Sequence, residues 1–245
     1  MTDGYRLVRL VYLPDTYFRC YETVPSLVEI YTLQTGIWRS ITAPGSPYII
    51  RDWSSSVFVN GVLHWLAHTW DQAPFRNVIV SFNMKDEAFG ELSMPKSLQG
   101  LENLNVTVAL VDGLLALVPC NKLGNEASEA VWVMKEYGVA ESWSKLFDIC
   151  IGGFNRVIGF TNSCEALVHT SGRLFSFRPC SPSGYLDLPI GVPADFYLDT
   201  YVESLVLLNV KDRVPGRHGN SSGGSQRTKK TRCLMLVPHS TFYNH

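Results

Sequence analysis

A pattern of strand, polar turn and aromatic residue recurs along this chain at intervals of about 50 residues. Its fullest copy is VWVMKEYGVAESWSKLF, at residues 131–147. Residues 131–134 predict a strand because four large apolar side chains follow one another, and the polar stretch after them predicts an exposed turn. Apolar residues return at Trp143 and Leu146. Their return indicates a second strand that pairs with the first.

Three further copies keep this order at residues 28–41, 78–92 and 174–188. The aromatic residues that share the place of Trp143 lie 51, 54 and 42 residues apart in the series Trp38, Phe89, Trp143 and Tyr185. Equivalent positions in stacked sheets meet the neighbouring sheet in the same way. We therefore expect all four aromatic side chains to lie in the core.

Two-residue turn signals lie between these copies. Asn60-Gly61 and Asp112-Gly113 are each flanked by apolar runs and are 52 residues apart, and a weaker counterpart at Asn162-Ser163 follows 50 residues later. Asn-Gly and Asp-Gly supply the positive φ angles that a type I′ hairpin turn requires. Each copy of the repeat therefore contains two hairpins in series, which predicts a four-stranded antiparallel sheet.

Four-stranded sheets repeated at this period are typical of propeller blades. We therefore predict an all-β chain that forms a kelch-like β-propeller with four-stranded antiparallel blades. A β-sandwich is the alternative, because its strands also recur every ~8 to 12 residues with turns between them. The propeller is favoured because a sandwich needs no internal period.

The start of the chain departs from the repeat. The strand predicted at residues 5–13 has no hairpin partner before it. We therefore expect the first blade to be truncated at its N-terminus, with a sheet edge left open to association.

The end of the chain changes in composition. The propeller-like domain is predicted to cover residues 1–210, with its last strand at 201–210. Residues 211–232 contain seven basic residues, one acid and a Gly/Ser tract, which predicts a flexible linker. Contact with nucleic acid or a nuclear import signal is the alternative role of this basic segment. Residues 233–245 are the C-terminal tail, with an edge-strand signal at 233–237.

Long and short connections alternate in the second module. The connections at residues 42–55, 67–77 and 96–105 are long, whereas the turns at 60–61 and 83–87 are short. Successive connections of an up-and-down sheet alternate between its two ends, so the long loops share one end, where binding surfaces are usually built. The aromatic, basic and histidine side chains there are typical of protein-binding hot spots. The candidates for binding a partner protein are Arg51, Trp53, His68, Trp70, Phe75 and Arg76. The alternative is that the loop aromatics pack under their own loops.

The sequence contains no motif of an enzyme or a cofactor site. It has neither a phosphate-binding glycine loop nor a GxSxG nucleophile turn. His64 and His68 are the only close histidine pair, with His68 expected in the loop, and no acid or cysteine completes a metal site around them. We expect a non-enzymatic protein without cofactor or metal.

Composition also limits the partners and the compartment. The net charge of −1, from 21 basic and 22 acidic residues, provides no field that would attract nucleic acid or an anionic membrane. No apolar run reaches the ~18 to 20 residues that span a bilayer, and the N-terminus lacks the pattern of a signal peptide. We expect a soluble protein of the cytoplasm or nucleus, with its six cysteines reduced.

Several segments resemble the F-box associated domain of plant F-box proteins, including the F-box/kelch-repeat type. In the order of that family, and across about residues 4–209, they are YRLVRLVYL, VEIYTLQTGIWRSI, VFVNGVLHWLA, IVSFNMKDEAFGELSMP, VWVMKEYGVAESWSKLF and YVESLVLL. The resemblance implies the substrate-recruiting module of a Skp1-cullin-F-box ubiquitin ligase. In such a ligase the F-box binds a Skp1-like adaptor and this domain holds the target protein.

The sequence departs from the family because it contains no F-box. The resemblance therefore implies a chain that binds a target protein but reaches a Skp1-like adaptor only through an F-box outside it. Two rival functions stay open. One is a scaffold or decoy without ligase function, and the other is a propeller enzyme or glycan binder that uses the same face, with convergent acids of perturbed pKa.

Overall fold

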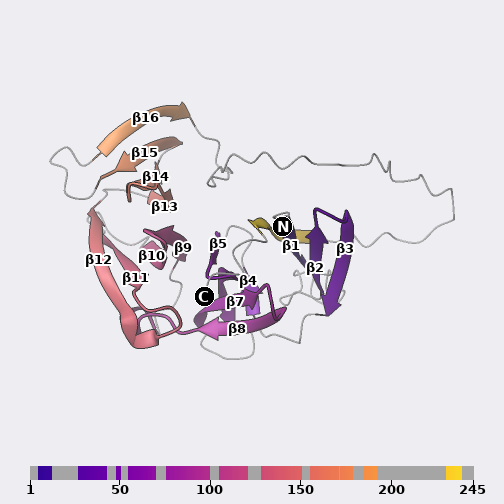
Figure 1. Cartoon of the computed structure of the whole chain (residues 1–245). Coiled ribbons are helices and arrows are strands. Elements are labelled where there is room, and N and C mark those ends of the chain that lie inside the picture. Colours follow the sequence, from indigo (N-terminus) through magenta and orange to yellow (C-terminus); the bar gives the residue numbers. More distant parts are fainter. Residues whose placement is uncertain are drawn as a thin grey trace, which may run out of the picture. The chain divides into compact units, whose positions relative to one another are not determined.

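The computed structural model of the chain consists of strands and two short 3₁₀ helices in the residues it describes (Figure 1). The chain divides into two compact units, unit 1 with Met1–Asp52 and Val202–His245, and unit 2 with Trp53–Tyr201. The described residues are 5–12, 27–42, 48–50, 55–69, 76–99, 105–120, 128–150, 155–170, 172–178, 185–191 and 230–238.

Unit 1 contains the first sheet, in which the strands follow the order β17-β1-β2-β3. These strands are β1 (Tyr5–Tyr12), β2 (Leu27–Thr32), β3 (Ile37–Thr42) and β17 (Lys230–Pro238), and the short β4 (Tyr48–Ile50) follows β3 in the chain. Val8, Leu10, Val28 and Ile30 alternate with polar neighbours and are buried on one face.

The fourth strand of this sheet comes from the far end of the sequence. β17 pairs antiparallel with β1 from Tyr5↔Pro238 to Tyr12↔Lys230, so β1 is paired on both sides. The expected gap beside β1 is therefore filled by the C-terminal strand rather than left open. β17 begins three residues before the predicted edge strand at 233–237, inside the segment predicted as a linker. The strand predicted at residues 201–210 lies outside the described residues.

Unit 2 contains three four-stranded antiparallel sheets, each built from strands in chain order (Figure 1). The second sheet contains β5 (Ser56–Val59), β6 (Val62–Thr69), β7 (Asn77–Asn83) and β8 (Ala88–Leu92), and η1 (Lys96–Leu98) follows it. The third sheet contains β9 (Asn105–Val111), β10 (Leu114–Cys120), β11 (Ser128–Met134) and β12 (Trp143–Cys150), with η2 (Ala140–Ser142) before β12. The fourth sheet contains β13 (Asn155–Phe160), β14 (Ala166–Thr170), β15 (Arg173–Phe177) and β16 (Tyr185–Gly191).

The tight hairpin turns have the geometry that their residues predict. Asn60 and Gly61 have φ angles of 51° and 77°, and Asp112 and Gly113 have 50° and 74°. Two successive positive φ angles define the type I′ turn. The weaker signal at Asn162-Ser163 forms a longer turn instead, in which Thr161 and Glu165 share a backbone hydrogen bond of 2.9 Å and Cys164 has φ 61°. Cys164 is a free thiol.

Replacing Gly113 by alanine is expected to lower the free energy of unfolding by about 1–2 kcal/mol, because an L side chain is strained at a positive φ. An added Cβ would meet nothing within 4 Å there, so backbone strain is the whole effect. Gly159→Ala is the matched control, since its position is equally open and has no positive φ. Urea denaturation of both variants measures the difference, and equal costs would contradict the turn assignment.

Hydrogen bonds between the sheets of unit 2 repeat with the period of the sequence. Ser55 Oγ donates to the Val108 carbonyl at 2.6 Å, and Thr107 Oγ1 donates to the Val157 carbonyl at 3.0 Å, across 53 and 50 residues. The first strands β5, β9 and β13 also contact one another in succession. The sheets therefore stack through equivalent first strands, which confirms the propeller-like architecture.

Strand β10 of the third sheet is buried on both faces, which explains its continuous apolar sequence. Along β10, Leu115 and Leu117 pack into a cluster with Val57 and Ile79 of the second sheet. Ala116 and Val118 point the other way, into a cluster with residues of the fourth sheet such as Val168. Because both faces of such a strand are buried, neither face carries exposed polar residues.

The prediction that all four recurring aromatic residues lie in the core is wrong. Trp143 is 8% exposed, but Trp38 is 42% exposed and Phe89 is partly exposed. The side chain of Tyr185 lies outside the described part. Each of these residues stands at or near the start of the last strand of its sheet, where one side is an edge. Burial there depends on what the neighbouring sheet supplies, and Trp143 alone is shown with such a partner, the Ser93 carbonyl at 2.8 Å.

Candidate functional site

The predicted binding surface includes the end of the second sheet where the chain passes from β6 to β7. β6 continues to Thr69 and β7 begins at Asn77, so both strands extend further than the loop predicted at residues 67–77. His68 lies in β6, opposite Asn77, and not in a loop as predicted. The ladder is longer because backbone pairing satisfies the amide groups at these positions.

Two hydrogen bonds hold the base of this connection. The Thr69 amide donates to the Arg76 carbonyl at 3.0 Å, and the Arg76 amide donates to Thr69 Oγ1 at 3.3 Å. Thr69 is buried. The described ends of β6 and β7 are therefore held together at one fixed point, which suits the presentation of a loop by a rigid scaffold.

Arg76 places a positive charge at the same point. Its guanidinium Nη1 donates to Glu91 Oε1 of β8 at 2.7 Å, while about half of the arginine side chain stays exposed. An exposed ion pair of this kind adds little stability, ~0–1 kcal/mol, but it sets the position of the guanidinium. Arg76 thus lies against β8, and it follows in sequence the segment that carries two predicted aromatic anchors.

The remaining predicted site residues, Arg51, Trp53, Trp70 and Phe75, lie outside the described residues. The structure therefore places His68 and Arg76 at neighbouring strand ends and leaves the rest of the surface as a prediction. The pattern of long loops holds in the third sheet, where residues 121–127 connect β10 to β11. It does not hold in the fourth sheet, where residues 171–172 alone connect β14 to β15 and Gly172 has φ 76°.

His64 joins the two segments that carry the most specific family resemblance. It belongs to NGVLHWLA, is fully buried, and its Nε2 lies 2.8 Å from the hydroxyl of Tyr137, in WVMKEYGV. Nδ1 lies 3.3 Å from the Val57 carbonyl. The geometry fits a neutral ring that donates from Nδ1 and accepts the tyrosine proton at Nε2. Burial lowers the pKa of His64 to about 4, and burial also raises the pKa of the Tyr137 hydroxyl.

The contact of His64 with Tyr137 bears on whether His64 and His68 could bind a metal ion. Both ring nitrogens of His64 already lie within hydrogen-bond distance of protein atoms, so a metal would have to displace one of them. Within the part of the chain that the structure describes, no three His, Cys, Asp or Glu side chains come together in a way that would hold a metal ion. Sequence reasoning missed Tyr137 because it reads as a residue of an exposed turn. The co-occurrence of the two segments that resemble the family was the only available signal, and it does not specify a contact.

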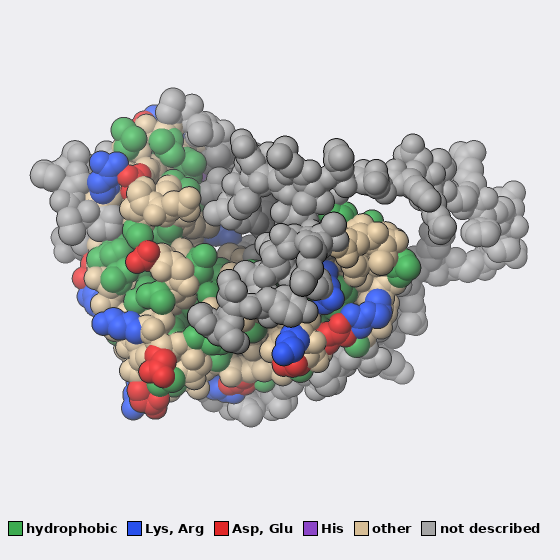
Figure 2. Space-filling view, in the orientation of Figure 1, with side chains coloured by type: hydrophobic (Ala, Val, Ile, Leu, Met, Phe, Trp, Pro, Cys, Tyr) green, Lys and Arg blue, Asp and Glu red, His purple; other side chains and the backbone are tan. Residues whose placement is uncertain are grey.

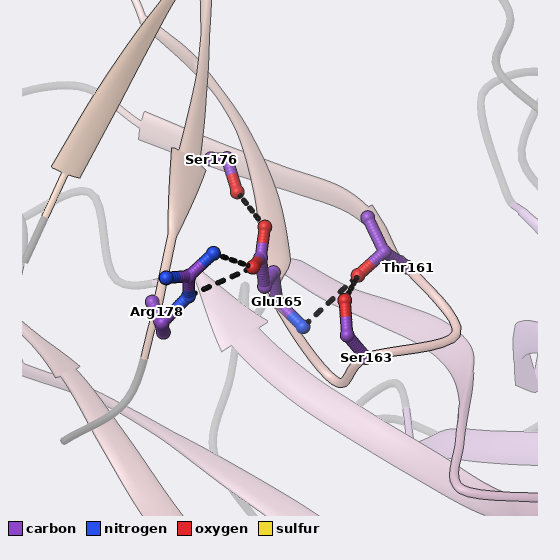
Figure 3. Close-up of polar contacts among 5 residues, drawn as sticks. All are labelled: Thr161, Ser163, Glu165, Ser176 and Arg178. Atoms are coloured by element: carbon purple, nitrogen blue, oxygen red, sulfur yellow. Dashed lines mark hydrogen bonds and ion pairs between the residues drawn. The ribbon is translucent and has the colours of Figure 1, made fainter. Parts of the chain in front are cut away.

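A second polar cluster lies at the β13–β14 turn (Figure 3). Glu165 accepts a hydrogen bond from Ser176 Oγ at 2.6 Å and a two-pronged ion pair from Arg178, whose Nε lies 2.8 Å away. The Glu165 amide donates to Thr161 Oγ1, which also bonds to Ser163 Oγ. The hydrogen bond from Ser176, followed by the contact with Arg178, holds the pKa of Glu165 below its usual range. The cluster fastens the turn to the end of β15, and sequence reasoning did not single out any of its members.

Charges of both signs are mixed over the face drawn in Figure 2. Lys and Arg side chains alternate with Asp and Glu side chains among the described residues there, with apolar atoms between them. Such a mixture fits the near-zero net charge of the sequence. In the described residues, no helix is long and apolar enough to cross a membrane.

Comparison with known proteins places these features in context. A family model described as the F-box associated beta propeller domain matches residues 1–171. Similar proteins of Arabidopsis thaliana include F-box protein At3g07870, 37% identical over 51% of this chain and 30% of that protein. F-box/kelch-repeat protein At3g23880 is 35% identical over 49% of this chain and 32% of its own length. F-box/LRR-repeat protein At2g43260 is 27% identical over 96% of this chain and 54% of its own length. The chain thus spans about a third to a half of the length of these relatives.

Proposed function

The chain belongs to the F-box associated β-propeller domain family, and from this premise we propose that it holds a target protein for ubiquitination when it acts with an F-box. The observation that carries the proposal is the family match over residues 1–171, together with the names of the relatives as F-box proteins. In this role the F-box binds a Skp1-like adaptor of a Skp1-cullin-F-box ligase. The chain itself binds the target protein and catalyses no reaction.

The loop end of the second sheet supports this role. The base at Thr69 and Arg76 is fixed by backbone and side-chain hydrogen bonds, so the strand ends on either side of residues 70–75 form a rigid frame. Aromatic anchors next to an exposed arginine match the composition of protein-binding hot spots. We assign the target-binding surface to Arg51, Trp53, His68, Trp70, Phe75 and Arg76.

Replacing Trp53, Trp70 and Phe75 together by alanine is expected to reduce recovery of a target protein about tenfold or more, because aromatic anchors carry much of the energy of such interfaces. The measurement is a pull-down with the whole chain, followed by the affinity of the recovered protein for the purified chain. Leu146→Ala is the matched control, since Leu146 is an exposed apolar residue of β12. Unchanged recovery by a folded triple variant would reject this surface.

A fusion of the chain to an F-box distinguishes a ligase subunit from a scaffold or decoy. Fused to an F-box, it is expected to recover a Skp1-like adaptor and the target in one complex. Recovery of the target without the adaptor, from a fusion whose F-box binds the adaptor by itself, would favour the scaffold.

A further inference from the structure

The end strands β3, β8, β12 and β16 each have an outer edge with no described strand beside it. The outer edge of a strand presents unpaired N–H and C=O groups that invite another strand. Proteins usually block such edges with charges, proline, glycine or bulges. Three of these four edges carry such features.

β8 and β12 are blocked by charges, and β12 also by irregular backbone. β8 is five residues long and contains Gly90 and Glu91, whose carboxylate binds Arg76. In β12, Lys145 and Asp148 form an ion pair at 2.7 Å. The pairing of β11 with β12 also skips Leu146, so this strand bulges at its middle.

β16 is blocked near its C-terminal end. Its register with β15 shifts between Leu188 and Gly191, and Pro189 within this stretch has no N–H to offer. An added strand would lose its regular ladder there.

β3 has none of these features. Its sequence, IWRSIT, contains neither proline nor glycine, and its six residues pair with β2 without a shift in register. Ile37 is 62% exposed and Trp38 is 42% exposed, and Arg39 is its single charged residue. A regular and apolar edge of this kind is a template for strand addition.

The exposed tryptophan of β3 is held in place before any partner arrives. The Trp38 ring packs on Tyr31 with centroids 5.1 Å apart, and the Arg9 guanidinium lies over it at 4.3 Å. Arg9 is itself fixed by an ion pair with Glu29, which is largely buried. A rigid aromatic side chain loses little conformational entropy on binding, so it makes an effective anchor.

We propose that the outer edge of β3 binds an extended segment of a partner protein as an additional strand. The backbone groups of an edge strand are matched by another extended strand, in which donors and acceptors have the same spacing. Side chains of β3 alternate in direction, so the segment should carry apolar residues at every second position, to pack on Trp38. The inference rests on the proposed function, because the partner is then the target protein or a part of it.

A display library of random 12-residue peptides, selected on the whole chain, tests this inference. We expect enriched peptides with apolar residues at every second position, and slower hydrogen exchange of the amides of residues 37–42 when a peptide is bound. Ile37→Lys should weaken binding about tenfold or more, because lysine blocks an edge. Leu186→Lys is the matched control, since Leu186 also lies on an edge strand and is likewise 62% exposed. It should change the affinity less than twofold.

Three results with the peptides would overturn the inference. They are selection without any enriched peptide, binding without protection of residues 37–42, and equal loss of affinity in both lysine variants. A dimer of the chain that Ile37→Lys disrupts and Leu186→Lys preserves would also overturn it, since a second copy would then occupy the edge. The triple variant of Trp53, Trp70 and Phe75 should still bind the peptide. If no peptide binds at β3 but the pull-down still recovers a target protein, the inference is overturned and the proposed function is not.

Discussion

Replacing Trp143 by alanine is expected to lower the free energy of unfolding of unit 2 by about 3–5 kcal/mol, the range for deleting a large aromatic side chain from a core. Trp143 is buried in the cluster between the second and third sheets, among Leu115, Leu117 and Met134. Alanine would leave a cavity there and would also remove the indole donor from the Ser93 carbonyl. Urea denaturation followed by far-ultraviolet circular dichroism measures the loss without depending on tryptophan fluorescence.

Two controls separate packing from sequence position. Trp143→Phe keeps most of the ring volume and loses the hydrogen bond, so it should cost about 1–3 kcal/mol. Trp38→Ala changes the equivalent residue of the first sheet, which is half exposed, and should cost about 1 kcal/mol through the lost contact with Arg9. If Trp38→Ala cost as much as Trp143→Ala, the burial of Trp38 would differ from that in the structure.

Acidification is expected to destabilise unit 2 by about 3 kcal/mol through His64 alone. The pKa of His64 is lowered to about 4 by burial, against 6.5 in the unfolded chain. Between these values the unfolded state binds a proton that the folded state does not, so stability falls as the pH falls. The contribution of neutral His64 is complete above pH 6.5 and is lost progressively down to about pH 4. Urea denaturation between pH 7.5 and pH 4 measures this slope.

A variant isolates the histidine from the carboxylates that titrate over the same range. His64→Gln has no titrating ring, so its stability should fall less between pH 7.5 and pH 4, by the same ~3 kcal/mol. Tyr137→Phe removes the hydroxyl that lies 2.8 Å from Nε2 but keeps the histidine, so it should lower stability at pH 7.5 and retain the slope. Parallel pH curves for the parent chain and His64→Gln would show that the histidine is not responsible.

Local turn chemistry was the part of the fold that could be predicted most directly. Asn60-Gly61 and Asp112-Gly113 determine both the turn type and the register of their hairpins, because few other residue pairs accept two positive φ angles. The spacing of these turns then implies equivalent sheets, and the cross-sheet bonds of Ser55 and Thr107 occur at the same spacing. The family resemblance of residues 131–147 agrees with the strand, turn and strand found there.

Features that depend on distant parts of the chain were not predictable in this way. Trp143 is buried and Trp38 is exposed although their local sequences are alike, and the cluster that buries Trp143 contains residues of the second sheet. The contact of His64 with Tyr137 joins positions 73 residues apart that no local pattern connects. At the candidate site, Arg76 was predicted as a binding residue, but its ion pair with Glu91 follows from the register of β7 and β8.

The pairing of β1 with β17 has a consequence for how the chain is made. β1, β2 and β3 leave the ribosome long before β17, which begins at Lys230. At synthesis rates of ~5–20 residues per second, the first hairpin waits roughly 10–40 s for its missing neighbour. All three sheets of unit 2 are translated during that interval. The first sheet is therefore expected to finish folding after the three sheets of unit 2, and a premature stop codon that removes β17 would harm the first sheet.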